Sequence, residues 1–127
     1  MQTISKKISM NKNFISVQSF EELNDTIKSE EGVLVYFSHE ECNVCKVLKP
    51  KVAEMVKENF SKLKMVYSDT VKIPEAAGQN RVFAVPTILL FLEGREYVRA
   101  SRNISVDELA RQIQRPYGMM FETVNED

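Results

Sequence analysis

The fold of this chain is decided by Val33-Leu34-Val35-Tyr36-Phe37, the polar break Ser38–Glu41 and Cys42-Asn43-Val44-Cys45, which follow one another directly. An unbroken apolar run, rich in β-branched and aromatic residues, is typical of a central strand covered on both faces. After Cys45, apolar residues recur every three to four positions as far as Phe60, which predicts an amphipathic helix. The Cys-x-x-Cys pair is therefore expected between a buried strand and a helix.

The rest of the chain alternates between strand and helix patterns. Capping boxes begin predicted helices at Ser19 and Ser105, and Pro74 begins a short helix. Pro50 should kink the helix that contains it, and Glu93-Gly94 is expected to form a tight hairpin turn. These signals predict an α/β fold of order βαβαβαββα, with a central mixed sheet flanked by helices. Its strands are expected over residues 14–18, 33–37, 63–67, 87–92 and 96–100.

One domain is predicted, because no linker, repeat or low-complexity tract divides the 127 residues. Residues 1–13 are interpreted as a flexible leader and residues 14–115 as the folded domain. Because proline is a helix breaker, Arg115-Pro116 is expected to end the last helix. Residues 116–127 are therefore interpreted as a C-terminal tail.

The composition excludes several classes of protein. A chain that is 43% hydrophobic and 28% charged is neither disordered nor a coiled coil. Seventeen Lys and Arg against eighteen Asp and Glu give a formal charge of −1, so no nucleic-acid partner is expected. No apolar run is long enough to span a membrane, and residues 1–10 lack the apolar core of a signal peptide. We therefore expect a cytoplasmic monomer without a membrane partner.

The two cysteines are the candidate catalytic residues. At the first turn of a helix, free backbone N–H groups and the helix dipole stabilise a thiolate and lower its pKa. Cys45, three residues later, lies on the same helix face one turn further in. Cys42 is therefore the expected nucleophile and Cys45 the expected resolving thiol.

Two other interpretations of the cysteine pair stay open. In the first interpretation, both thiols are buried structural residues. In the second, His39-x-x-Cys42-x-x-Cys45 supplies three zinc ligands, and Glu40 or Glu41 completes the site. We favour redox chemistry with no bound metal, because a structural zinc site needs four ligands and the chain has no other Cys or His. His39 is interpreted as a loop residue that modulates Cys42 rather than as a catalytic base.

The chain resembles the thioredoxin family over roughly residues 14–115. The resemblance is carried by the strand at 33–37, Cys42-Asn43-Val44-Cys45, Pro50, and Val85-Pro86-Thr87 ahead of Ile88–Phe91 and Gly94. It implies a thioredoxin-like fold and a cis peptide before Pro86, with Val85 and Pro86 positioning the substrate chain.

The resemblance also implies an activity, that of a thiol–disulfide oxidoreductase in cell redox homeostasis. Its partners are protein disulfide substrates and an external thiol reductant or reductase. No dissociable cofactor is expected, because the Cys42–Cys45 pair itself carries the electrons.

Five positions depart from the family's pattern. Glu41 stands where a Trp is usual, and Asn43-Val44 replace Gly-Pro. Tyr36 falls on the family's buried Asp, and Arg102 falls on the glycine that lines the substrate groove. Tyrosine has an ordinary pKa of about 10 and is a poor proton acceptor at neutral pH. Tyr36, Glu41 and Arg102 keep open a second hypothesis, a non-catalytic thioredoxin-fold module that binds proteins.

Overall fold

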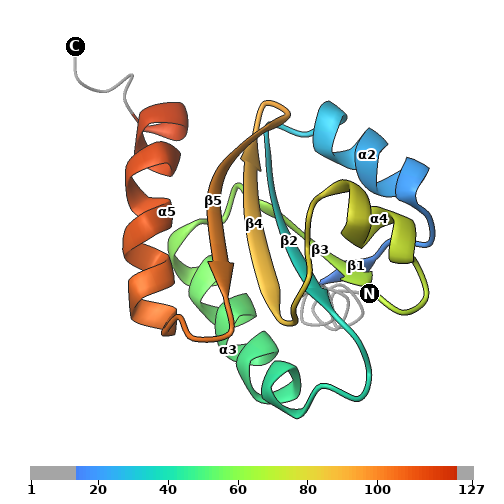
Figure 1. Ribbon diagram of the computed structural model, residues 1–127. Coiled ribbons are helices and arrows are strands. Elements are labelled where there is room, and N and C mark those ends of the chain that lie inside the picture. Colours follow the sequence, from blue (N-terminus) through green and yellow to red (C-terminus); the bar gives the residue numbers. More distant parts are fainter. Residues whose placement is uncertain (1–13, 123–127) are drawn as a thin grey trace, which may run out of the picture.

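The computed structural model describes residues 14–122 of the chain (Figure 1). Its strands form one five-stranded sheet in the order β1-β3-β2-β4-β5, so the strand that precedes the cysteines is central. The predicted α/β class is confirmed. The elements are β1 (Ile15–Ser16), α2 (Phe20–Ser29), β2 (Gly32–Ser38), α3 (Asn43–Asn59), β3 (Lys64–Asp69), α4 (Pro74–Gln79), β4 (Thr87–Leu92), β5 (Arg95–Ser101) and α5 (Val106–Phe121).

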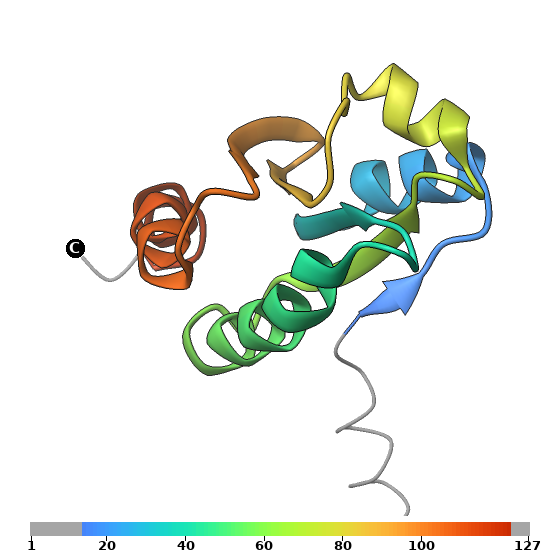
Figure 2. The same ribbon diagram turned by 60° about the horizontal axis from the view of Figure 1, so that its bottom comes forward.

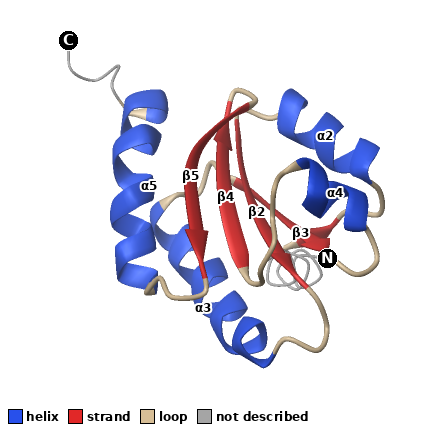
Figure 3. Cartoon of the chain, viewed as in Figure 1, coloured by secondary structure: helices blue, strands red, loops and turns tan. Residues whose placement is uncertain are grey.

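The sheet is mixed, as the sequence predicts (Figure 3). Strands β1, β3 and β2 are parallel, whereas β4 pairs antiparallel with both β2 and β5. The β4–β5 turn has positive φ angles at Glu93 (51°) and Gly94 (83°). Two such residues match the twist of the flanking strands, and so the tight hairpin is confirmed.

Helices cover both faces of the sheet (Figure 2). All seven residues of β2 are buried, and alternate side chains point to opposite faces. Leu34 and Tyr36 lie in one core cluster with residues of α3 and α5. Val33, Val35 and Phe37 lie in a second cluster with residues of α2 and α4. The unbroken apolar pattern of β2 therefore reflects two separate cores.

Both predicted N-caps are present. The Oγ atoms of Ser19 and Ser105 accept hydrogen bonds from the backbone N–H groups of Glu22 (3.0 Å) and Glu108 (3.1 Å). Helix α3 runs from Asn43 to Asn59 with Pro50 inside it.

The predicted end of the last helix is wrong. Helix α5 continues through Pro116 to Phe121, so the first residues of the expected tail are helical. The reason is tertiary packing: Tyr117 is 4% exposed, and its ring lies 4.9 Å from that of Phe60. Its hydroxyl also accepts a hydrogen bond from the backbone N–H of Lys62 at 3.2 Å. These contacts hold the helix together beyond a residue that usually ends one.

The first predicted strand is shorter than expected, and the predicted leader lies outside the described residues. Strand β1 spans only Ile15 and Ser16 rather than residues 14–18. The predicted leader, residues 1–13, and residues 123–127 lie outside the described part. No helix within residues 14–122 combines the length and apolar character needed to cross a bilayer.

Candidate active site

The two cysteines lie at the junction of β2 and α3. They are joined in a disulfide, with their Cα atoms 5.3 Å apart. Cys42 is the N-cap of α3, and its Sγ accepts a hydrogen bond from the backbone N–H of Cys45 at 3.2 Å. The Cys42 N–H donates to the carbonyl oxygen of His39 at 3.3 Å. The backbone thus fixes the Cys42 sulfur at the positive end of a helix, where a thiolate is stabilised.

The two cysteines differ in exposure. Cys45 is 2% exposed and belongs to the core beneath α3, whereas Cys42 is partly buried at the edge of that core. A sulfur in contact with solvent can meet a disulfide from another molecule, and a covered one cannot. This difference is the one that the predicted roles of Cys42 and Cys45 require.

Tyr36 lies directly beneath the cysteine pair. Its side chain is fully buried, and its hydroxyl donates a hydrogen bond to the carbonyl oxygen of Cys45 at 3.2 Å. Burial, with a smaller contribution from Tyr67, raises its pKa far above the ordinary value. Tyr36 therefore stays protonated at neutral pH and ties β2 to the first turn of α3.

A cluster of rings and one lysine surrounds Tyr36. The Tyr36 ring centroid lies 5.4 Å from that of Phe14 and 6.5 Å from that of Tyr67. The Nζ atom of Lys49 lies 4.1 Å from the Tyr67 centroid, a cation–π contact, and burial lowers the Lys49 pKa. The sequence carried no clear sign of this cluster, although Lys49 lies four residues after Cys45 and so on its helix face.

Val85 and Pro86 lie at the same edge of the sheet as the cysteines. The peptide between them is cis, the isomer that the family resemblance implies. Because Phe37 of β2 pairs with Thr87 of β4, the segment enters the sheet beside the end of β2. Val85 and Cys42 pack against the same core cluster.

Arg99 fastens the chain ahead of this segment, a role that the sequence did not reveal. Its Nη2 and Nη1 atoms donate hydrogen bonds to the carbonyl oxygens of Asn80 (2.9 Å) and Arg81 (3.2 Å). Its Nε and Nη2 atoms also donate to the carboxylate of Glu96, at 2.8 and 2.9 Å. Strand β5 thereby holds the loop between α4 and β4.

The remaining predicted residues lie in the β2–α3 loop. His39 is partly buried and Glu41 is exposed, and neither makes a described side-chain hydrogen bond within residues 14–122. Glu40 forms an exposed ion pair with Lys72 at 3.6 Å. Among the described residues, no three His, Cys, Asp or Glu side chains are grouped so that they could hold a metal ion.

Several apolar side chains are exposed around the cysteines. Val44 (43% exposed) and Val47 (60%) lie on the first turns of α3, and Val71 (71%) follows β3. Phe83 (86%) lies in the loop before β4. All four belong to the edge of the sheet where β2 and β3 end and β4 begins. Their sequence signal was weak: large apolar residues at positions where loops and helix faces are usually polar.

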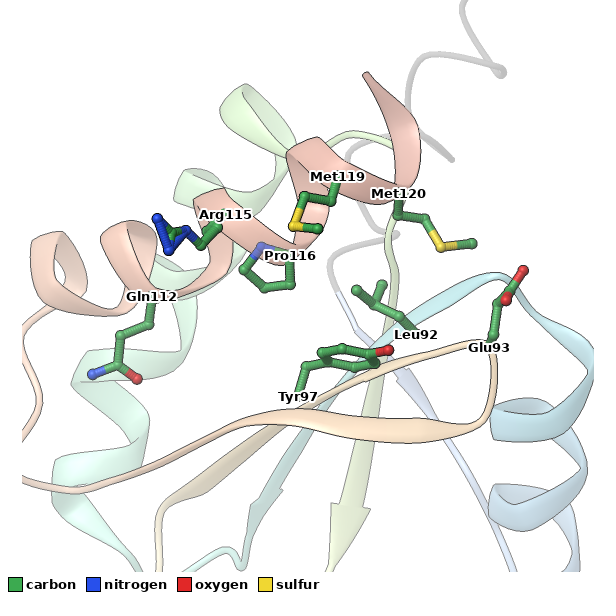
Figure 4. Close-up of a pocket in the computed structure, with 8 residues that line it drawn as sticks. All are labelled: Leu92, Glu93, Tyr97, Gln112, Arg115, Pro116, Met119 and Met120. Carbon is green, nitrogen blue, oxygen red and sulfur yellow. The ribbon is translucent and has the colours of Figure 1, made fainter. Parts of the chain in front are cut away.

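Two grooves lie at opposite ends of the molecule. Arg102, exposed after β5, lines a groove of about 420 Å³ beside the first turns of α3. The other, of about 430 Å³, lies between α5 and the β4–β5 hairpin and is lined by residues that include Tyr97, Pro116 and Met119 (Figure 4). No cysteine or histidine lines this second groove, so it is separate from the disulfide.

Comparisons with known proteins agree with this site. The sequence model of the Thioredoxin family matches residues 14–115. The chain is 28% identical over 106 residues to Thioredoxin-like protein YdfQ of Bacillus subtilis, covering 84% of this chain and 94% of that protein. It is 33% identical over 82 residues to a thioredoxin of Rickettsia bellii, covering 65% of this chain and 76% of that protein.

Solved structures show the same fold. A mutant thioredoxin from Halobacterium salinarum superposes with a TM-score of 0.71 at 24% identity, covering 87% of this chain and 94% of that one. Oxidised thioredoxin from Plasmodium falciparum gives 0.72 at 22% identity, covering 82% and 98%. With the family match over most of the chain and the Cys42–Cys45 disulfide at the start of α3, this chain belongs to the thioredoxin family of thiol–disulfide oxidoreductases.

Proposed function

We propose that the chain exchanges disulfides with protein substrates, with Cys42 as the nucleophile and Cys45 as the resolving thiol. The observation that carries the proposal is the unequal setting of the two sulfurs. Cys42 is only partly buried and its sulfur accepts a hydrogen bond from a backbone N–H, whereas Cys45 is 2% exposed. Cys45 can then break, from inside the protein, the mixed disulfide that Cys42 forms with a substrate.

The reaction has two exchange steps. The Cys42 thiolate attacks one sulfur of the substrate disulfide, and the other substrate sulfur leaves as a thiolate. Cys45 then loses its proton and attacks the Cys42 sulfur, which releases the second substrate thiolate and closes the Cys42–Cys45 disulfide. Two electrons pass to the substrate. Because the pKa of Tyr36 is raised, solvent rather than Tyr36 accepts the Cys45 proton.

Protein substrates fit the surface around Cys42. Exposed apolar side chains beside a reactive group provide the contacts that a polypeptide uses and a small thiol does not. Val44, Val47 and Phe83 supply such contacts. Val85 and Pro86 position the substrate backbone next to Cys42.

The oxidised pair must be reduced again after each turnover. We propose an external thiol reductant or reductase as the electron source and no dissociable cofactor. A dithiol that is repeatedly reduced suits the cytoplasm, where the glutathione and thioredoxin systems keep thiols reduced. We place the protein there as a monomer, and we expect Glu41 and His39 to modulate Cys42 from the loop.

Reduction of a protein disulfide, such as that of insulin, with dithiothreitol as the electron source tests the proposal. The wild-type protein should reduce insulin well above the dithiothreitol background, and Cys42→Ser should fall to that background. Glu58→Gln, an exposed substitution near the far end of α3, serves as the control for folding. Wild-type activity at background would contradict the proposal and favour the non-catalytic binding module.

A further inference from the structure

The groove beside Cys42 has one apolar wall. It measures about 420 Å³ and lies between the first turns of α3 and the turn after β5. Val44, Val47 and Leu48 form its apolar wall, and Asn43, the residue after Cys42, also lines it. The groove therefore offers apolar contacts to a substrate segment whose cysteine meets Cys42.

Two cations line the same groove. Lys51 and Arg102 are its charged residues, and no carboxylate lines it. Both side chains are exposed, and neither forms an ion pair with another residue of the described range 14–122. In a chain whose formal charge is −1, two unpaired cations at one groove are a local feature rather than a consequence of composition.

The opposite side of Cys42 carries the opposite charge. Glu40 and Glu41 lie in the loop before Cys42, and Glu40 has Lys72 as its partner. A substrate that crosses the disulfide therefore meets carboxylates on one side and cations on the other. This arrangement orients a charged segment as well as attracting it.

We infer that this groove selects protein disulfides whose reactive cysteine is flanked by an apolar and an acidic side chain. The inference rests on the proposed function and adds the substrate class to it. Arg102 presents a planar fork that binds a carboxylate through two hydrogen bonds, and Lys51 adds a point charge. Contacts at such an exposed rim act mainly on the rate of encounter and weaken with salt.

Two synthetic peptides with the same mixed disulfide and the same flanking leucine provide the test. One carries Glu beside the leucine and the other carries Lys. At about 50 mM salt the wild-type protein should react with the acidic peptide about fivefold faster, as kcat/KM, and about 500 mM salt should largely remove the difference. Equal rates at low salt, or a preference for the Lys peptide, would overturn the inference.

Charge reversal assigns the effect to the groove. Arg102→Glu and Lys51→Glu should each abolish or invert the preference. Arg95→Glu, the same change of charge at the far end of β5, should keep it. A preference that survives both groove variants would also overturn the inference. Because the measurement is a ratio between two peptides, a variant with reduced overall activity still reports on selectivity.

A third substrate, without charge, shows whether a negative result disproves the substrate class or the proposed function itself. Bis(2-hydroxyethyl) disulfide is uncharged and too small to reach both sides of the groove. If the wild-type protein reduces this compound and both peptides equally well, exchange through Cys42 stands and the selectivity is wrong. If it reduces none of the three, the proposed function itself is wrong.

Discussion

Two buried hydroxyl groups on neighbouring strands show how differently the two faces of the sheet are used. On the face covered by α3 and α5, the Tyr36 hydroxyl donates to the Cys45 carbonyl oxygen at 3.2 Å. On the face covered by α2 and α4, Ser68 of β3 lies in register with Phe37. Ser68 is fully buried, and its Oγ has no hydrogen-bond partner within the described residues.

The comparison separates a polar group that serves the site from one that only costs stability. A buried hydroxyl that is hydrogen-bonded contributes about 1 kcal/mol, whereas one without a partner costs about 1–3 kcal/mol. The hydroxyl of Tyr117, also on the α3 and α5 face, is bonded to the Lys62 N–H. Substitutions on this face should therefore affect the site or its support, and those on the other face should affect stability alone.

The largest expected effect is at Cys45, the reactive group buried on the α3 and α5 face. Cys45→Ser removes the resolving thiol but leaves Cys42 free to attack, so mixed disulfides with substrates should accumulate and dithiothreitol should release them. Non-reducing electrophoresis measures the trapped species. Cys42→Ser, the matched variant, should trap nothing. Equal trapping by both variants would contradict the assigned roles.

Next in size is the loss of Tyr117, which holds the end of α5 on the same face. Tyr117→Ala removes a buried ring that contacts Phe60 and Phe121, so the free energy of unfolding should fall by about 3 kcal/mol. Tyr117→Phe removes only the acceptor for the Lys62 N–H and should cost about 1 kcal/mol. Urea denaturation measures both. Unchanged stability in Tyr117→Ala would show that residues 116–121 act as the tail that the sequence indicates.

Local sequence patterns were enough to predict most of the fold. The apolar run of β2, the capping serines and the Glu93-Gly94 turn each depend on neighbours in sequence, and the structure confirms them. The helix end at Arg115 was wrong because the residue that overrides Pro116 is Tyr117, whose partner Phe60 lies far away in sequence.

The site was predictable to a lesser extent. Cys42 and Cys45 could be identified because spacing and helix position determine their chemistry. The bonds from Tyr36 to Cys45 and from Arg99 to Asn80 and Arg81 could not, because they go to backbone carbonyl groups, which carry no sequence signal. The exposure of Phe83 likewise depends on how the loop before β4 packs.

A smaller effect is expected when the bonded hydroxyl is removed. Tyr36→Phe should lower the free energy of unfolding by about 1 kcal/mol because it breaks the bond to Cys45. Insulin reduction near neutral pH should stay within about twofold of wild type, because a phenol with a raised pKa takes no proton there. A loss of tenfold or more would contradict this and show that the hydroxyl either takes part in proton transfer or holds Cys45 in place for the reaction.

The pH dependence of stability gives a second readout for Tyr36. The pKa of Tyr36 is higher in the folded protein than the unfolded value of about 10. Its contribution to the free energy of unfolding is therefore fully present below about pH 10. That contribution is lost as the pH rises above about 10, because only the unfolded chain then ionises readily. Tyr36→Phe should therefore lose less stability than wild type in urea denaturation at alkaline pH.

The smallest effect is expected on the opposite face, with the opposite sign. Ser68→Ala removes a buried hydroxyl that has no described partner, and alanine keeps the rest of the side chain. The free energy of unfolding should therefore rise by about 1 kcal/mol, with no change in insulin reduction, because Ser68 points away from the cysteines. Urea denaturation of Ser68→Ala and of Tyr36→Phe makes the comparison direct. Each variant removes one hydroxyl from one of two adjacent strands, and the first should be more stable than wild type and the second less stable. A loss of stability in Ser68→Ala would mean that the hydroxyl has a partner, such as a buried water molecule, and that the two faces treat polar groups alike.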